Sequence, residues 1–230
     1  MDRCIPEVKR LEGQYLKHQI KQKTKKISES VIKIPYNIRR AYNKRRIRSR
    51  DFTVISNNCW AGKLYQYLDM PYLSPTVGLY FFADDYIKFV KNLKYYMSID
   101  LKFISVEESK YKDELIKRKH DLIPLAKLDD VEIVFLHYKT NEEAKEKWNR
   151  RKQRINWENI YFKFSKMNFC TEEHLKVFSE LPFRHKFMLN NRKPPRYNCE
   201  FYWNGKSNEN EIILDTDPFP GNLCLRKLIR

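Results

Sequence analysis

Glycine is scarce in this sequence, and the residues present are far apart. The five glycines are Gly13, Gly62, Gly78, Gly205 and Gly221. This spacing forms neither the G-x-G-x-x-G fingerprint of dinucleotide-binding proteins nor the glycine-rich loop that binds phosphate in P-loop nucleotidases. The sequence therefore argues against a dehydrogenase and against a P-loop enzyme.

Cysteine is also sparse and carries no paired pattern. The five cysteines are Cys4, Cys59, Cys170, Cys199 and Cys224. Their number is odd and no C-x-x-C pair occurs, which argues against a disulfide framework and against a structural zinc site. No H-E-x-x-H motif and no zinc-deaminase signature is present either, so no metal site and no cofactor are predicted.

Long apolar runs are missing. The longest, Val77 to Ala83, is far shorter than the roughly 20 residues that cross a bilayer. The first residues, Met1 to Pro6, lead directly into charged sequence without the apolar region of a secretion signal. We therefore expect a cytoplasmic protein.

What the sequence does contain is a globular composition with an uneven charge. The chain has 230 residues, 42% of them hydrophobic and 33% charged, which is enough for one sizeable core. The net charge is +17, and residues 1–50 hold 16 Lys and Arg against 4 Asp and Glu. We predict a basic helical extension over residues 1–50 and one domain over residues 51–230.

The basic extension has three possible roles. Apolar residues recur at helical spacing along one side, namely Leu16, Ile20, Ile27, Val31 and Ile34. The segment either packs this stripe on the domain, binds nucleic acid, or docks on an anionic membrane. Packing is the simplest role. Of the other two we favour the membrane, because basic residues mixed with aliphatic and tyrosine side chains suit an anionic interface. Residues 8–50 would then contact the inner face of the membrane.

After Arg50 the pattern predicts an α/β protein with a three-layer, open, mostly parallel sheet. Short apolar runs predict strands at 52–56, 101–104, 131–136, 160–164 and 186–189. Amphipathic segments predict helices at 62–68, 84–97, 141–154 and 171–179. The stretch from Asn190 is rich in Pro, Asn and Gly, so we expect loops and an edge hairpin there.

A cysteine follows the first predicted strand directly. The run from Phe52 to Gly62 indicates a buried strand, a polar turn and the start of a helix, with Cys59 at the turn. The carboxyl edge of an open α/β sheet is where ligands bind, and a helix N-terminus lowers the pKa of a thiol. We therefore predict Cys59 as a low-pKa nucleophile, although a lone cysteine is more often a small buried apolar residue.

A histidine follows another predicted strand. His137 comes after the run 131–136, so it meets Cys59 at one edge if the two strands are parallel neighbours. The pair then forms a nucleophile and its base. Asn57, Asn58 and Trp60 are the candidates for orienting the pair or for stabilising an oxyanion. A histidine satisfied in place, without a catalytic role, is the simpler alternative.

The predicted helix at 141–154 carries many charges. Pairs four residues apart, such as Glu143 with Lys147, are typical of a solvated face. Lys147, Arg150 and Arg154 also share one side of the helix, an arrangement that suits a phosphate or pyrophosphate. We predict that these three residues bind a phosphorylated donor.

Four motifs together resemble a known family. They are Ile55 to Gly62 (ISNNCWAG), Ser74 to Leu79 (SPTVGL), Phe135 to Lys139 (FLHYK) and Trp148 to Arg151 (WNRR). In this order they resemble the bacterial domain-of-unknown-function family 1919, whose members are commonly labelled exopolysaccharide biosynthesis proteins. The resemblance spans about residues 51 to 190 and implies a three-layer α/β fold and a place in polysaccharide assembly. The turn and the later histidine also resemble papain-like cysteine peptidases and capsule acyltransferases.

These observations predict a transferase of exopolysaccharide or capsule biosynthesis. Its specific form is acyl transfer to a glycan through a Cys59 thioester that His137 activates, with an activated acyl or sugar compound as the donor. A sugar-nucleotide glycosyltransferase is the first alternative, with Asp84, Asp85, Asp129 or Asp130 binding metal and diphosphate. A non-catalytic nucleic-acid-binding or scaffolding protein is the second, although nucleic acid is not the favoured partner.

Overall fold

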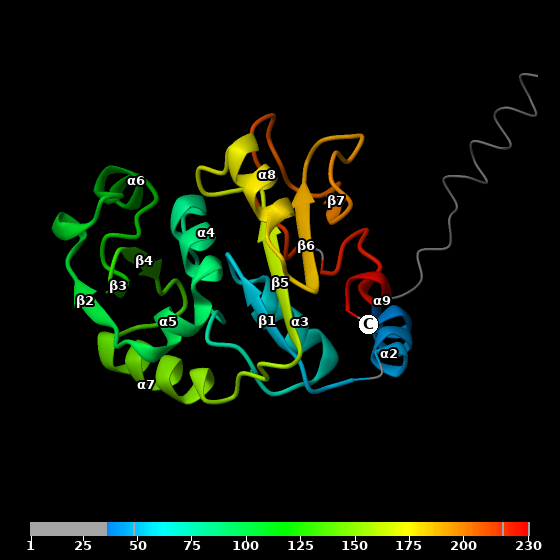
Figure 1. The fold of residues 1–230 in the computed structure, drawn as a ribbon, viewed down its shortest axis with the longest axis horizontal. Helices are drawn as coiled ribbons and strands as arrows, with labels where there is room; N and C mark the ends of the chain where they lie inside the picture. Colours follow the sequence, from blue (N-terminus) through cyan, green and yellow to red (C-terminus); the bar gives the residue numbers. More distant parts are fainter. Residues whose placement is uncertain (1–35, 48, 218, 230) are drawn as a thin grey trace, which may run out of the picture. The chain divides into compact units, whose positions relative to one another are not determined.

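The protein has a mixed α/β fold. The computed structural model describes residues 36–47, 49–217 and 219–229. The chain divides into two units, 1–42 and 43–230, and the architecture below belongs to the second. That unit contains a parallel sheet with helices on both faces and a smaller antiparallel sheet (Figure 1). The predicted mostly parallel α/β fold is confirmed.

The larger sheet is entirely parallel. Its strands, in spatial order, are β1 (Thr53–Ser56), β5 (Ile160–Ser165), β6 (His185–Asn190) and β7 (Glu200–Tyr202). Thr53 is paired with Ile160, and Tyr161 with His185, so the strands end together at one carboxyl edge. The middle strands β5 and β6 are buried along most of their length, as parallel sheets covered on both faces require.

Each face of this sheet has its own core, because side chains alternate along a strand. Ile55 and Phe164 face one core, and Val54 and Tyr161 face the other. The first core is completed by α4 (Ala83–Lys91), α5 (Leu93–Ser98), α7 (Asn141–Lys152) and α8 (Glu172–Glu180). The second is completed by α3 (Trp60–Leu68) and α9 (Leu225–Leu228).

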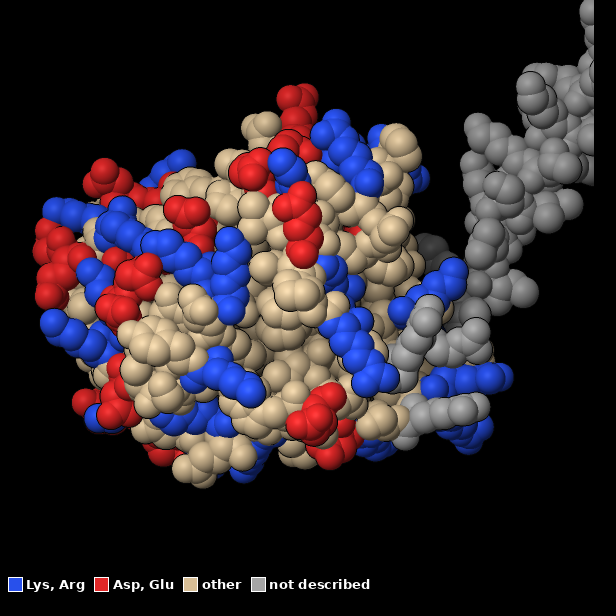
Figure 2. Space-filling model, viewed as in Figure 1, with Lys and Arg blue, Asp and Glu red and all other residues tan. Residues whose placement is uncertain are grey.

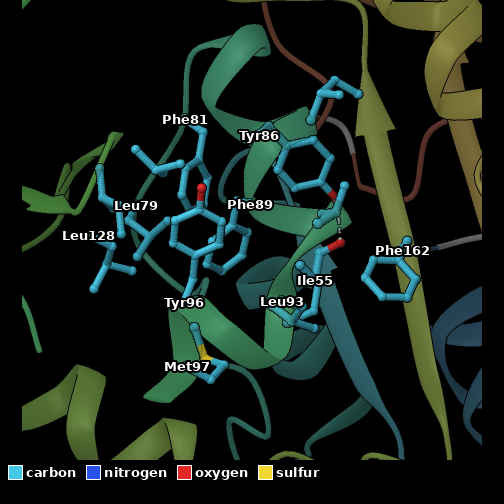
Figure 3. Close-up of a cluster of buried hydrophobic side chains, with 14 of the residues drawn as sticks. Ile55, Leu79, Phe81, Tyr86, Phe89, Leu93, Tyr96, Met97, Leu128 and Phe162 are labelled. Atoms are coloured by element: carbon cyan, nitrogen blue, oxygen red, sulfur yellow. Dashed lines mark hydrogen bonds between the residues drawn. The ribbon is translucent and has the colours of Figure 1, made fainter. Parts of the chain in front are cut away.

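A tyrosine ties the first core to the sheet (Figure 3). The hydroxyl of Tyr86, on α4, lies 2.8 Å from the carbonyl oxygens of both Ile55 and Lys163. Its ring stacks on Phe164, with 5.3 Å between centroids. A buried tyrosine needs such a partner, and this one fixes α4 against β1 and β5.

The smaller sheet is antiparallel. It contains β2 (Lys102–Ile104), β3 (Leu125–Leu128) and β4 (Val131–Val134), with the short helices η1 (Val106–Glu108) and α6 (Lys112–Lys117) between β2 and β3. The prediction that Cys59 and His137 meet required β4 to be a parallel neighbour of β1. The structure shows that it is not. A two-residue turn at Asp129, whose φ is 55°, joins β3 to β4.

An extended segment joins the two sheets. The Tyr80 amide donates to the Val134 carbonyl (2.9 Å), and the Val134 amide donates back (3.0 Å). One residue on, the Phe81 amide donates to the Asn57 carbonyl at the end of β1 (3.0 Å). Residues 78–81 therefore lie between β1 and β4 and hold both.

Several expected elements differ in detail. The helix predicted over 84–97 is two helices, because the backbone of Asn92 leaves the helical region at φ −124° and ψ 40°. After Asn190 the edge of the sheet is the parallel strand β7, and an isolated antiparallel bridge joins Ser207 and Ile212. Of the basic extension the structure describes α2 (Tyr36–Arg46), and the helix predicted before Pro35 lies outside the described residues. Within the described ranges, every helix is too short or too polar to span a lipid bilayer.

Candidate functional site

A pocket of about 350 Å³ lies where α3, the segment 72–78, residues 137–138 and α7 meet. Cys59 and His137 both line it. Its remaining lining residues are Gly62, Lys63, Gln66, Tyr72, Val77, Gly78, Tyr138, Lys147 and Arg151. The structure thus brings the two predicted catalytic residues to one site, by a different route from the one expected.

Cys59 is positioned by the end of β1. It is the residue immediately before α3, with φ −68° and ψ 2°. Its thiol points to the carbonyl of Leu79, at 3.8 Å. The turn before it is fixed by the Ser56 hydroxyl, which donates to the Asn58 carbonyl (2.6 Å). The sulfur is therefore held at the start of the helix, as the sequence predicted.

The environment of Cys59 nevertheless opposes ionisation. Burial raises the pKa of the Cys59 thiol to about 12, and the negative charge of Asp215 adds to the effect. The positive charges of Lys163 and Lys63 lower the pKa, but by less. Desolvation disfavours the thiolate more than the two lysines favour it. The prediction of a low-pKa thiol is wrong, and the group is protonated near neutrality.

His137 reaches the pocket through Gly78. Its amide donates to the Gly78 carbonyl (3.0 Å), and Gly78 has φ +79°. A Cβ on Gly78 would lie 3.1 Å from the ring of Tyr138 and 3.5 Å from the Cβ of His137. Only glycine fits this backbone and this space. The His137 side chain is exposed, and in the described part of the chain no hydrogen bond joins it to Cys59.

Arg151 is the most strongly fixed cation of the pocket. It is 6% exposed and its Nη1 donates to the Val77 carbonyl (3.0 Å) and to the Tyr138 hydroxyl. The guanidinium carbon lies 4.9 Å from the centre of the Tyr72 ring, and Gln66 Nε2 donates to the Tyr72 hydroxyl (2.8 Å). Arginine stacks on aromatic rings in this way, so its orientation is set in advance.

The lining of the pocket is positively charged. Lys63, Lys147 and Arg151 line it, and no Asp or Glu does. Lys147 pairs with Glu143 on the same helix. Among the described residues, no carboxylate lies within ion-pair distance of Lys63 or Arg151. A buried guanidinium without a carboxylate suits an anionic ligand.

The predicted donor-binding row is only partly at the pocket. Lys147 lines it, but Arg150 points away and pairs with Glu146 at 2.9 Å, with both side chains half exposed. Arg154 is exposed, with Nη1 3.5 Å from the Tyr72 carbonyl, and it does not line the pocket. The cation that accompanies Lys147 is Arg151, one turn further along α7.

The sequence pattern of α7 indicates that Arg151 faces the interior. The buried positions of α7 are Ala144, Trp148 and Arg151, at helical spacing. An arginine in a row of apolar positions faces the interior, whereas Arg150 and Arg154 belong to the solvated side. The buried side of α7 therefore places Arg151 at the pocket beside Lys147, where Arg150 and Arg154 were predicted.

The three predicted orienting residues hold the fold and do not line the pocket. Asn57 Nδ2 donates to the Ser165 carbonyl (3.1 Å), and the Ser165 amide donates to Asn57 Oδ1 (3.0 Å). Asn58 Nδ2 donates to Asp215 at 2.9 Å. Trp60 is fully buried, 5.2 Å from the ring of Phe187. The structure shows none of them in contact with His137, which corrects their predicted role.

A buried ion pair lies behind Cys59. Lys163, on β5, and Asp215 are 0% and 1% exposed and form a salt bridge. Asn58 Oδ1 accepts from Lys163 Nζ (2.9 Å), and the Ser165 hydroxyl donates to Asp215 (2.5 Å). Burial lowers the pKa of Lys163, and the carboxylate opposes that shift. This cluster was not predicted, because the two charges are 52 residues apart in the chain.

The aspartates considered for metal binding have other partners. Asp84 pairs with His174 at 3.0 Å, and buried Asp85 pairs with Lys110. Asp129 accepts from Tyr95 (3.0 Å), and Asp130 pairs with Lys88 (2.9 Å). In the part of the chain that the structure describes, no three His, Cys, Asp or Glu side chains gather as metal ligands. The four aspartates therefore hold the fold and lie outside the pocket.

Comparison with known proteins identifies the family but no activity. The model of a family described as a domain of unknown function, DUF1919, matches residues 30–217, and the chain belongs to this family. A protein of Haemophilus influenzae named "Uncharacterized protein" is 29% identical over 168 residues, which are 73% of this chain and 75% of the relative. The resemblance seen in the four motifs is thus confirmed. Neither finding supports the exopolysaccharide label.

Proposed function

We propose that this member of the DUF1919 family binds a phosphorylated donor in the pocket between α3 and α7 and transfers a group from it. The observation that carries the proposal is Arg151, which is nearly buried, held in place by Val77 and Tyr138, and without a carboxylate partner among the described residues. Lys63 and Lys147 add two further positive charges to the same lining. Such a set of donors matches the charge and geometry of a phosphate or diphosphate.

The same cations also suit the chemistry of transfer. When a phosphate or diphosphate leaves, negative charge grows on its oxygens. Fixed positive groups stabilise that charge without having to reorganise. Since Arg151 is oriented before any ligand arrives, its contribution grows as the leaving group develops charge. The acceptor, which we expect to be a sugar hydroxyl, must lose a proton in the same step.

His137 is the group of the pocket that accepts that proton. It lines the pocket and is exposed, so an acceptor from solvent reaches it. An imidazole can act as a general base toward a hydroxyl and return the proton to solvent afterwards. The thiol of Cys59, protonated under these conditions, is not required as a nucleophile in this mechanism.

Isothermal titration calorimetry with inorganic pyrophosphate tests the proposal. We expect the wild-type protein to bind pyrophosphate, and Arg151→Lys to bind at least ~10-fold more weakly, because lysine keeps the charge and loses the bidentate geometry. Arg150→Gln is the matched control, since Arg150 lies one position away and outside the pocket. Equal affinity of the two variants, or no binding by the wild type, would overturn the proposal.

Acyl transfer through Cys59 is the second candidate, favoured because Cys59 and His137 line one pocket. In that reaction the thiol proton passes to His137 as sulfur bonds to the acyl carbon. The bond from that carbon to the phosphate oxygen breaks, and the phosphate leaves with the proton. Because burial raises the pKa of the thiol to about 12, the thiolate is scarce near neutrality and the reaction depends on transfer of the proton to His137.

Intact-protein mass spectrometry with acetyl phosphate separates the two candidates. A covalent mechanism predicts one added acetyl group that is absent from Cys59→Ala and slow to form in His137→Gln. The first candidate predicts no adduct on Cys59 and continued pyrophosphate binding by Cys59→Ala. An adduct spread over lysines in wild type and Cys59→Ala alike would remove the covalent mechanism.

A further inference from the structure

A second hollow, of about 480 Å³, lies between α5 and the amino ends of β5 and β6. This is the end of the sheet opposite the carboxyl edge. Figure 2 shows an uncharged area low on the visible face, with basic side chains on both sides of it and an acidic patch below it. Neither the pocket described above nor the proposed function uses this surface.

The floor of the hollow is apolar and its rim is aromatic. The rings of Phe162 and Phe183 stack at 3.7 Å between centroids and lie in the floor. Trp157 and Tyr95 stand at the rim and are 42% and 48% exposed. Large exposed aromatic side chains gathered round an apolar depression are unusual on a protein surface that meets only water.

The position of Trp157 is built into the backbone. The side chains of Asn156 and Asn159 both donate to the carbonyl of Asp51, at 3.2 and 3.0 Å. The Glu158 amide donates to Asn156 Oδ1 (3.1 Å). The residues on each side of Trp157 are therefore anchored. The conformation of this turn is what holds the indole at the surface.

The rim is also basic. Lys91, Lys94 and Arg184 line the hollow together with a single carboxylate, Glu158. None of the three basic side chains has an ion pair among the described residues, although Lys94 Nζ lies 6.0 Å from the centre of the Trp157 ring. The surface therefore combines an apolar floor, amphipathic aromatic side chains and an excess of positive charge.

We propose that this hollow docks on an anionic lipid bilayer. Tryptophan and tyrosine are enriched at the level of lipid headgroups, where the ring meets hydrocarbon and its polar atom meets water. Basic side chains beside them attract acidic headgroups. A polyanion without hydrocarbon, such as a nucleic acid, would satisfy the basic residues but leave the apolar floor in contact with water.

None of the residues that line this docking surface belongs to the basic extension. The extension was predicted to contact the membrane through residues 8–50, and residues 8–35 of it lie outside the described part of the chain. The turn that carries Trp157 follows α7, which supplies Lys147 and Arg151 to the pocket. Docking through Trp157 therefore places the end of α7 near the bilayer, whatever the extension does.

Tryptophan fluorescence of the full chain with lipid vesicles tests the proposal. The four tryptophans include three that are at most 1% exposed, Trp60, Trp148 and Trp203, so a change on binding reports Trp157. With phosphatidylglycerol vesicles we expect a blue-shifted emission, and quenching when the lipid chains carry bromine. Vesicles of phosphatidylcholine alone should cause neither change.

Two triple variants of equal net charge separate the hollow from general basicity. Lys91→Glu, Lys94→Glu, Arg184→Glu should lose at least ~10-fold of the phosphatidylglycerol affinity and the bromine quenching. The control is Lys145→Glu, Lys176→Glu, Lys206→Glu, which changes exposed lysines outside the hollow and should retain both. Trp157→Ala should weaken flotation with the vesicles, with circular dichroism to show that it folds.

Three results would overturn the proposal. Wild-type protein that floats with vesicles without bromine quenching is bound through another surface. Equal losses in the two triple variants would show that only net charge matters. Absence of binding to phosphatidylglycerol vesicles would exclude the membrane as the partner of this surface.

Discussion

Two nearly buried cations of this protein, Lys163 and Arg151, differ in what satisfies them. Lys163 is fully enclosed and is paired with Asp215, with Asn58 as a further partner. Arg151 is held by neutral groups, the Val77 carbonyl and the Tyr138 hydroxyl. The charge of Lys163 is neutralised by a carboxylate inside the fold, whereas the charge of Arg151 is available to an anionic ligand. The contrast separates a cation that stabilises from one that is available to a ligand.

The largest expected effect comes from breaking the ion pair between Lys163 and Asp215. Asp215→Ala leaves Lys163 buried without a countercharge, which costs about 3 to 5 kcal/mol of unfolding free energy. Urea unfolding followed by circular dichroism measures it. The double variant Lys163→Met, Asp215→Leu removes both charges and should recover most of the loss. A cost below about 1 kcal/mol for Asp215→Ala would show that the pair is not buried in solution.

The next largest effect is on the pKa of Cys59, to which the charges of Asp215 and Lys163 both contribute. With a pKa raised from 9.0 to about 12, the thiol should react with iodoacetamide at a rate that keeps rising well above pH 9. Asp215→Asn should lower the apparent pKa, because it removes a negative charge that opposes the thiolate. Peptide mapping of the labelled protein across a pH series measures it. A labelling midpoint at or below 9.0 in the wild type would contradict the assignment.

A smaller effect is expected from Gly78, which packs against Tyr138, the residue that holds Arg151. Gly78→Ala places a Cβ at φ +79° and 3.1 Å from Tyr138. We expect a loss of about 1 to 3 kcal/mol in stability and weaker pyrophosphate binding. Thermal unfolding with and without pyrophosphate measures both. Unchanged affinity in a destabilised variant would show that Tyr138 does not position Arg151.

The smallest effect comes from the neighbour of Arg151. Arg150→Gln breaks a pair with Glu146 in which both side chains are half exposed. Such a pair contributes about 0.5 kcal/mol or less. Urea unfolding should therefore barely change. A large loss would mean that the two arginines of α7 do not differ in the way the structure indicates.

Much of the fold was accessible from the sequence, because it is carried by local patterns. The apolar runs gave the strands at Thr53–Ser56 and Ile160–Ser165 within a residue or two. The helix predicted over 171–179 agrees with α8 within one residue at each end, and the Thr171 side chain caps it by accepting from the His174 amide. The strand β3 was missed, because its four residues contain a lysine and the two-residue turn at Asp129 went unrecognised as a hairpin.

The site was accessible only in part, because it depends on packing between distant segments. Cys59 and His137 line one pocket, and their predicted catalytic roles stay predictions, but the pairing of Tyr80 with Val134 that joins their two sheets could not be read from the sequence. The high pKa of Cys59 follows from burial, which a helix-terminus argument does not contain. Which of Arg150 and Arg151 faces inward was decided by the core around Trp148.

The 52 residues that separate Lys163 from Asp215 have a consequence for biosynthesis. When β1 and β5 have left the ribosome, Lys163 has no countercharge, because its partner is synthesised 52 residues later. The α3 face of the sheet therefore closes only after Asp215 has emerged. A product that stops before Asp215 keeps an unmatched ammonium in its interior, so the cell's proteases should remove it while a chain that includes Asp215 survives.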